Sequence, residues 1–248
     1  MDPGWNQEGL GEPDHHVELS VASGRLIVLE GAEAAGKSTQ LRRLSSSLSA
    51  RGIANDSWPE PGGTPLGREV REMLLDRSRS ISSPAEALLF MAARAELVTC
   101  LVRPALEQGR TVLLDRFFLS TYAYQVHGRG LPEEAVRAAN ALATGGLVPD
   151  LTLVLVVDSG ERAGRVERRG GTDRLESAGD AFHRRVAKAF DSFVAPEWQS
   201  THPECGPIER IDGAGDEETV ARRIAEALSR RWPETFSFPL AGPTAEMR

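Results

Sequence analysis

The segment that most restricts the fold of this chain is the octapeptide at residues 31–38, Gly-Ala-Glu-Ala-Ala-Gly-Lys-Ser. It follows a β-rich apolar run at residues 25–30 and precedes residues 37–50, in which leucines recur at helical spacing. The glycines let the backbone curl so that successive N–H groups point at an anion, with the N-terminus of a helix behind them. The order of strand, glycine-rich loop and helix therefore predicts a site for the phosphates of a nucleoside triphosphate.

The polar side chains of this loop have expected roles. Lys37 can reach the β- and γ-phosphates, and the hydroxyl of Ser38 can ligate Mg²⁺. The residues expected to bind the nucleotide here are Gly31, Ala34, Ala35, Gly36, Lys37, Ser38 and Thr39. The loop by itself does not separate kinases from switches, motors or transport ATPases.

Strand-like and helix-like segments alternate along most of the chain. Five short apolar or β-rich runs are expected to be strands, at residues 25–30, 53–58, 111–114, 151–157 and 208–211. Helical spacing separates them, and one long helix is expected from Pro84 to about Glu107. Continuous apolar strands between helices predict a parallel sheet covered on both faces. We therefore expect one α/β domain, a P-loop NTPase fold with a five-stranded parallel sheet flanked by helices.

The two ends of the chain lack apolar periodicity. We expect residues 1–23 to be a flexible N-terminal tail, residues 24–232 to be the domain, and residues 233–248 to be a C-terminal tail. The two cysteines, Cys100 and Cys205, have no metal-ligand spacing. Because Cys100 lies in an apolar helical pattern, we expect it to be buried.

Composition restricts the class of partner. The net charge of −7 argues against a protein that coats nucleic acid, and the apolar runs are too short to span a bilayer. No basic stretch followed by an apolar one opens the chain, so we expect no secretory signal and a cytoplasmic location. A substrate with several negative charges would need a local cluster of arginine and lysine in this acidic body.

Two groups of charged residues follow expected strands. Asp115 and Arg116 come directly after residues 111–114, where a carboxylate can hold Mg²⁺ and a guanidinium can face phosphates. Five arginines follow the fourth strand around the pair Gly170-Gly171, at positions 162, 165, 168, 169 and 174. We interpret residues 164–177 as a short mobile lid whose arginines stabilise the transferring phosphoryl group and exclude water; a solvated helix face is the alternative.

In this order of motifs the chain resembles bacterial thymidylate kinases over residues 25–231. The motifs are the loop 31–39, EPGGTPLG at 60–67, LLFMAARA at 88–95, DRF at 115–117, STYAYQ at 120–125 with GRGL at 128–131, PDL at 149–151, and DRLE at 173–176. The resemblance implies transfer of the γ-phosphoryl group of ATP to dTMP with Mg²⁺, directly and in line. It also implies a homodimer, with the helices around residues 84–107 as one possible interface.

The resemblance also implies residue roles. Catalytic roles are implied for Lys37, Arg116, Arg169, Glu33 and Asp115, with Ser38 and Asp115 at the metal. Substrate contacts are implied for Glu33, Phe90, Arg94, Arg116, Thr121, Gln125 and Arg174, with Phe90 stacked on the pyrimidine and Arg94 at the edge of the base. Arg165 is implied on the ATP side. Members of the family carry an essential arginine either in the loop or in the lid. Since this loop contains none, the resemblance implies that the lid supplies the catalytic guanidinium.

Four positions depart from the family pattern. Pro59 stands where an arginine is usual, Phe117 where a tyrosine is usual, Val126 where a small residue is usual, and Ala34-Ala35 where Gly-Ala is common. Since Phe117 and Val126 lie near the implied acceptor site, a kinase for another pyrimidine monophosphate, such as a 5-modified dUMP, is an alternative. A non-catalytic P-loop nucleotide-binding regulator is the alternative from another class.

Overall fold

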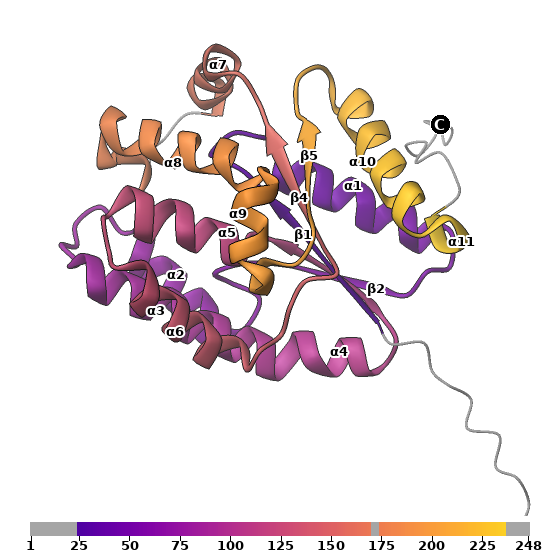
Figure 1. Cartoon of the computed structure of the whole chain (residues 1–248), viewed down its shortest axis with the longest axis horizontal. Helices are drawn as coiled ribbons and strands as arrows, with labels where there is room; N and C mark the ends of the chain where they lie inside the picture. The colour runs from indigo at the N-terminus through magenta and orange to yellow at the C-terminus, as the bar shows by residue number, and fades with distance from the viewer. Residues whose placement is uncertain (1–23, 170–173, 237–248) are drawn as a thin grey trace, which may run out of the picture.

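In the computed structural model, which describes residues 24–169 and 174–236, five strands form one parallel sheet (Figure 1). The strands are β1 (Arg25–Glu30), β2 (Asn55–Pro59), β3 (Thr111–Asp115), β4 (Leu151–Val156) and β5 (Ile208–Asp212). Their order across the sheet is β2-β3-β1-β4-β5, and each neighbouring pair is parallel. The predicted five-stranded parallel α/β fold is confirmed.

The central strand β1 is buried on both faces. Its residues 26–29 are 0% exposed. Leu26 and Val28 belong to one hydrophobic cluster, whereas Ile27 and Leu29 belong to the cluster on the other face. Because successive side chains of a strand point to opposite faces, a continuous apolar run is what a sheet covered on both sides requires.

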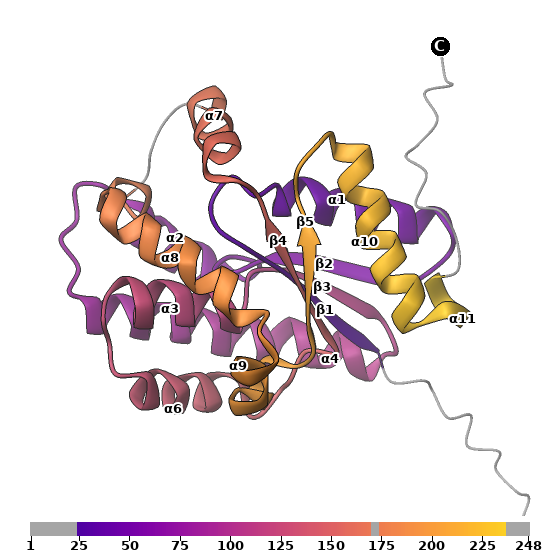
Figure 2. The same ribbon diagram turned by 45° about the horizontal axis from the view of Figure 1, so that its top comes forward.

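Helices cover the two faces (Figures 1 and 2). One face carries α1 (Lys37–Ala50), α10 (Glu217–Arg231) and α11 (Pro233–Phe236), whose apolar residues pack in one cluster with β1. The remaining helical segments are α2 (Pro65–Leu75), α3 (Ser83–Leu97), η1 (Val98–Val102), α4 (Arg103–Glu107), α5 (Phe118–Thr121), η2 (Tyr122–Gly128), α6 (Glu133–Thr144), α7 (Ser159–Arg169), η3 (Glu176–Ala178), α8 (Asp180–Phe193), α9 (Pro196–Thr201) and η4 (Pro203–Cys205). None of the helices in the described ranges is long and apolar enough to cross a bilayer.

Several helix boundaries follow from local sequence. Thr64 caps α2, accepting a hydrogen bond of 2.9 Å from the Gly67 N–H, and Pro65 occupies the first turn. Asp216 caps α10 in the same way, with 2.8 Å to the Thr219 N–H. Helix α1 instead starts at Gly36, whose φ of 95° is favourable only for glycine. Its first N–H groups are therefore left for a ligand.

The long helix expected from Pro84 to Glu107 is interrupted. Residues 98–102 form the π-helix η1, and the Arg103 N–H donates to the Val98 carbonyl. Pro104 follows directly and has no N–H with which to continue the α-helical bonding. The prediction that Cys100 is buried is wrong: Val98 and Val102 face the core, and Cys100, between them on the opposite side of the turn, is exposed.

The C-terminal boundary of the domain also differs from the expectation. Residues 233–236, assigned from the sequence to a tail, form α11, and Phe236 is 1% exposed in the cluster that contains Trp232. One aromatic residue at the end of a polar stretch has no periodicity to reveal it. The domain therefore extends at least to Phe236.

Candidate active site

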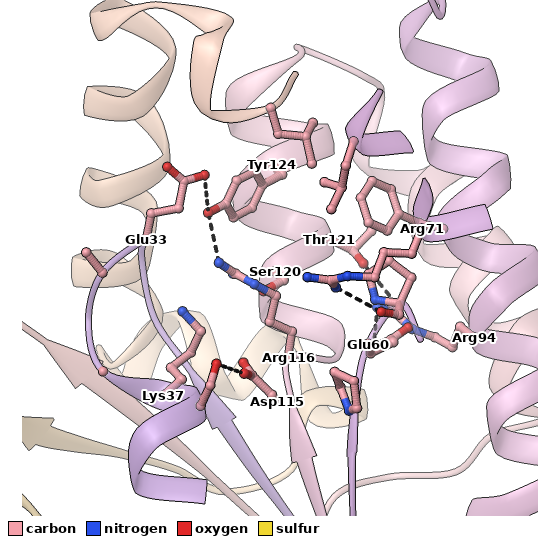
Figure 3. A pocket seen from close by; sticks show the side chains of 18 of the residues that line it. Glu33, Lys37, Glu60, Arg71, Arg94, Asp115, Arg116, Ser120, Thr121 and Tyr124 are labelled. Atoms are coloured by element: carbon pink, nitrogen blue, oxygen red, sulfur yellow. Dashed lines mark hydrogen bonds and ion pairs between the residues drawn. The ribbon is translucent and has the colours of Figure 1, made fainter. Parts of the chain in front are cut away.

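A cavity of about 460 Å³ opens at the carboxyl ends of β1 and β3. Figure 3 shows Lys37 and Asp115 toward one end, Arg94 and Thr121 at the other, and Arg116 between them. The predicted site residues that line it are Glu33, Ala34, Gly36, Lys37, Ser38, Thr39, Phe90, Arg94, Asp115, Arg116, Thr121, Gln125 and Arg165. The tertiary structure thus brings the nucleotide loop and the residues implied for the base into one cavity.

The loop after β1 has the backbone that its glycines predict. Gly31 has a φ of 140°, and a Cβ there would lie 2.5 Å from the Leu155 carbonyl oxygen, so no other residue fits. Ala34 has a φ of 56°, an uncommon conformation for a residue with a side chain. Such strain is common where a backbone is held for ligand binding.

The Lys37 ammonium lies within this loop. Its Nζ donates to the carbonyl oxygens of Gly31 at 3.0 Å and Ala32 at 2.9 Å. The residue is 6% exposed, and burial together with the neighbouring Arg116 lowers the pKa of Lys37 to about 7. An anion placed beside this side chain would restore the charged form.

Ser38 and Asp115 form the candidate metal site. The Ser38 hydroxyl donates to Asp115 Oδ2 at 2.5 Å, and Asp115 is the last residue of β3. One hydroxyl and one carboxylate are hard oxygen donors. This set fits Mg²⁺, which usually binds proteins through one or two groups and completes its octahedron with phosphate oxygens and water.

Arg116 is held at the centre of the cavity. Its φ is 79°, and its Nη1 donates to Ser120 Oγ at 2.9 Å and to the Gly31 carbonyl at 3.3 Å. Its Nη2 donates to the Tyr124 hydroxyl at 3.2 Å, and that hydroxyl lies 3.4 Å from Glu33 Oε1. The guanidinium therefore points into the space between the loop and the base end.

Glu30 is a positioning residue that the sequence did not reveal. It is 0% exposed, and its Oε1 accepts the N–H groups of Phe117 at 2.7 Å and Ser120 at 3.0 Å, which fixes the start of α5. Its Oε2 accepts the Ser120 hydroxyl at 2.6 Å, and Ser120 in turn accepts from Arg116. Because Glu30 ends an apolar strand, its position alone suggested only a strand terminus.

Arg94 lies in the wall of the cavity and is 2% exposed. All five of its N–H groups have acceptors: both carboxylate oxygens of Glu60, the side-chain oxygens of Thr121 and Asn140, and the Phe117 carbonyl. Burial raises the pKa of Glu60, while the paired Arg94 opposes that effect. The structure therefore gives Arg94 a structural role in addition to the base contact that the resemblance implies.

The arginines implied for the lid lie in different places. Arg165, on α7, reaches over the loop: its Nη1 donates to the Ala34 carbonyl at 3.3 Å and its Nη2 to the Gly213 carbonyl at 3.0 Å. Arg174 is not among the residues that line the cavity, and its guanidinium contacts the Leu74 carbonyl and Glu86. Residues 170–173 and the side chain of Arg169 lie outside the described part of the chain.

The lining residues that were not predicted as site residues include Arg71 and Tyr124. Arg71, on α2, lines the cavity, and its Nη1 donates to the Pro61 carbonyl at 2.9 Å. Tyr124 lines it beside Arg116. Pro59 stands where an arginine is usual, which was a signal to look for another cation. That this cation is Arg71, 12 positions later and on the next helix, depends on the tertiary structure.

Comparisons with known proteins indicate one family. The sequence model of the family described as thymidylate kinase matches residues 29–203. The chain is 44% identical over 211 residues to a thymidylate kinase of Deinococcus radiodurans, with 85% of this chain and 99% of the relative covered. It is 46% identical over 229 residues to that of Chlorobium chlorochromatii, covering 88% and 100%. It is 48% identical over 216 residues to that of Desulfovibrio desulfuricans, covering 83% and 96%.

Proposed function

This chain belongs to the thymidylate kinase family and catalyses the ATP-dependent phosphorylation of dTMP, and we propose that the cavity between β1, β3 and α3 is where the transfer takes place. The observation that carries the assignment of residues is the shared cavity: the phosphate loop and the base end line the same space, with Arg116 between them. The two alternatives, another acceptor or a non-catalytic regulator, are not favoured by these matches.

At the donor end, the loop would hold the phosphates of ATP. The N–H groups at the start of α1 have no side-chain cap and are available to phosphate oxygens. Lys37 would leave the carbonyls of Gly31 and Ala32 to contact the β- and γ-phosphates. Ser38 and Asp115 would hold Mg²⁺, which when bound neutralises charge on the transferring phosphates.

At the acceptor end, the base would lie between Phe90 and the wall formed by Thr121 and Gln125, with Arg94 at its edge. Arg116 would bind the acceptor phosphate, and Arg71, which lines the same end of the cavity, would be a second cation for it. This would compensate for the arginine missing at Pro59. Glu33, beside Tyr124, would contact the sugar hydroxyl.

The transfer itself would be direct. The protein positions the two nucleotides, and Lys37, Arg116 and the lid arginine Arg169 stabilise charge on the transferring group. Arg165 already spans the loop from α7 and would shield the donor phosphates from water. A cytoplasmic location, where both nucleotides are used, is part of this proposal.

An acceptor panel tests the assignment. We expect kcat/KM at fixed ATP to be highest for dTMP and about tenfold or more lower for dUMP, since one methyl group contributes roughly 1–3 kcal/mol in a fitted pocket. UMP and CMP should be poorer still. A 5-hydroxymethyl-dUMP that exceeds dTMP would leave the fold and mechanism intact and overturn the acceptor. If kcat/KM is highest for CMP or UMP, the assignment of the base end is wrong as a whole.

We also propose a homodimer that uses α2, α3 and α6. These helices pack side by side, and they carry large apolar side chains with unusual exposure: Leu142 at 87%, Leu88 at 62%, Leu66 at 43% and Met73 at 37%. Sedimentation analysis should give a dimer for the wild type and a monomer for Leu142→Glu. A wild-type monomer at micromolar concentration would contradict the proposal.

A further inference from the structure

Glu86 joins three separate parts of the structure near the base end of the cavity. It lies in the first turn of α3, is 0% exposed, and accepts four hydrogen bonds. Arg129 donates from Nε at 3.0 Å and from Nη2 at 2.9 Å, Arg174 donates from Nη2 at 2.7 Å, and Gln125 donates from Nε2 at 3.2 Å. Nothing in the catalytic scheme above uses this carboxylate.

The two arginines hold the Glu86 carboxylate in place. Arg129 lies over the ring of Phe182 at 4.5 Å, and Arg174 also donates to the Leu74 carbonyl at 2.8 Å. The side chains of these arginines are only 21% and 12% exposed. Charge-assisted hydrogen bonds from planar guanidinium groups are strong and directional, so the carboxylate has little freedom to rotate.

A carboxylate held this way determines which end of the Gln125 amide faces it. A carboxylate paired with guanidinium groups only accepts hydrogen bonds, whereas an amide has one donor end and one acceptor end. The NH₂ group of Gln125 must therefore face Glu86, because the flipped amide would place two acceptors against each other. Gln125 is 2% exposed and lines the cavity, and its Oε1 accepts no hydrogen bond within the ranges that the structure describes.

We propose that Glu86 is a positioning residue that sets base specificity, by holding the Gln125 amide so that its carbonyl oxygen is presented to the acceptor nucleotide. A carbonyl oxygen can accept the N3–H of thymine or uracil. It cannot bond the N3 of cytosine, which is itself an acceptor. The inference rests on the proposed function, in which Gln125 contacts the base. It adds the reason why this contact favours a base that carries a proton on N3.

The competing explanation is that Glu86 only ties α3 to η2 and to the segment at Arg174. In that case its removal would lower stability and the rate with every acceptor equally. The preference between two bases separates the two roles. A general loss of rigidity in this region would not exchange a hydrogen-bond acceptor for a donor at the base, so it would not change that preference. The best matched acceptors are dTMP and 5-methyl-dCMP, which share the methyl group, sugar and phosphate and differ only at N3 and C4.

The test is a double-mutant cycle of Glu86→Gln and Gln125→Ala on the full chain, with kcat/KM measured for both acceptors. A glutamine at 86 can present either its donor or its acceptor, so the Gln125 amide is free to flip. We expect Glu86→Gln to lower the ratio of dTMP to 5-methyl-dCMP by about tenfold or more, because one well-formed base contact has this effect. In the Gln125→Ala background the same substitution should change the ratio by less than about twofold.

Glu133→Gln is the matched control. Glu133 also lies in the first turn of a helix, α6, and pairs with an arginine, Arg137, but its other partner is His202 and not Gln125. Its substitution should leave the ratio at the wild-type value. If Glu86→Gln does not fold, as judged by circular dichroism, the cycle is repeated with Glu86→Asp. The shorter carboxylate keeps the charge for the arginines but weakens the contact with Gln125.

The outcomes are distinguishable. A folded Glu86→Gln protein with the wild-type ratio overturns the inference and leaves the function intact. A similar decrease of the ratio when Glu86→Gln is introduced into the wild type and into Gln125→Ala also overturns the inference, because the effect then does not depend on Gln125. If Gln125→Ala alone leaves the ratio unchanged, the base contact assigned to Gln125 is wrong. The inference, which depends on that contact, is then wrong as well. If the wild type does not phosphorylate dTMP, the function itself is wrong.

Discussion

Binding of ATP should be accompanied by the uptake of a proton at Lys37. Burial and Arg116 lower the pKa of this ammonium to about 7, although Asp115, Glu30 and Glu33 partly oppose the shift. At pH 8 the side chain of the free enzyme is therefore about nine-tenths neutral. The triphosphate of ATP brings several negative charges to the same place and favours the ammonium, so the pKa must rise on binding.

The size and sign of the effect follow from linkage. If the bound pKa is two units higher, binding takes up about 0.8 proton at pH 8 and about 0.1 proton at pH 6. Because the bound state holds more protons, affinity falls as the pH rises above 7. Under the same assumption, affinity weakens by about 25-fold between pH 7 and pH 9, and below about pH 6 this contribution is nearly constant.

Isothermal titration calorimetry would measure the uptake. A non-hydrolysable ATP analogue with Mg²⁺ is titrated at pH 6 and pH 8 in buffers of different ionisation enthalpy, and the slope gives the number of protons. Lys37→Met is the control, since it keeps the length of the side chain and retains the proton exchange of the nucleotide itself. Equal uptake at the two pH values, or undiminished uptake in Lys37→Met, would refute the reasoning.

Three further predictions address the site. Lys37→Ala should abolish turnover while the circular dichroism spectrum is unchanged, because a cation at the transferring phosphate contributes several kcal/mol; a folded and fully active variant would contradict the loop assignment. Arg169→Ala should lower kcat far more than it raises either KM, as steady-state kinetics can show, and a change confined to the KM of ATP would mean that it only binds the ground state. Glu60→Gln should lower the free energy of unfolding by about 3–5 kcal/mol in urea titrations, because it leaves the guanidinium of Arg94 buried without its partner charge; a loss below about 1 kcal/mol would show that the pair is dispensable.

Parts of the structure that depend on neighbours in the chain were predictable. The apolar run of β1, the glycine conformations of the loop and the leucine spacing of α1 are local signals, and each led to the observed element. The long helix was recognised as well, but its π-helical interruption before Pro104 and the exposure of Cys100 were not. Helical spacing assumes a constant number of residues per turn, and η1 breaks that assumption.

The buried carboxylates that support the site could not be read from the sequence. Glu30, Glu60 and Glu86 occupy the end of a strand, the start of a loop and the first turn of a helix, positions where a glutamate is ordinary. Their partners are distant: Glu60 pairs with Arg94, 34 positions away, and Glu86 with Arg174, 88 positions away. Only folding brings these groups within hydrogen-bond distance and removes the water that would otherwise solvate them.

The sequence by itself thus determined the fold class, the phosphate loop and, through the order of its motifs, the family and the reaction. These depend on backbone geometry and on short spacings, which residue types dictate directly. The tertiary structure decided which side chains face the cavity, including Arg71 and Tyr124, and which are held behind it, as Arg174 is. The reason is that hydrogen bonding and burial depend on distances in space, and these distances cannot be inferred from the separation of residues along the chain.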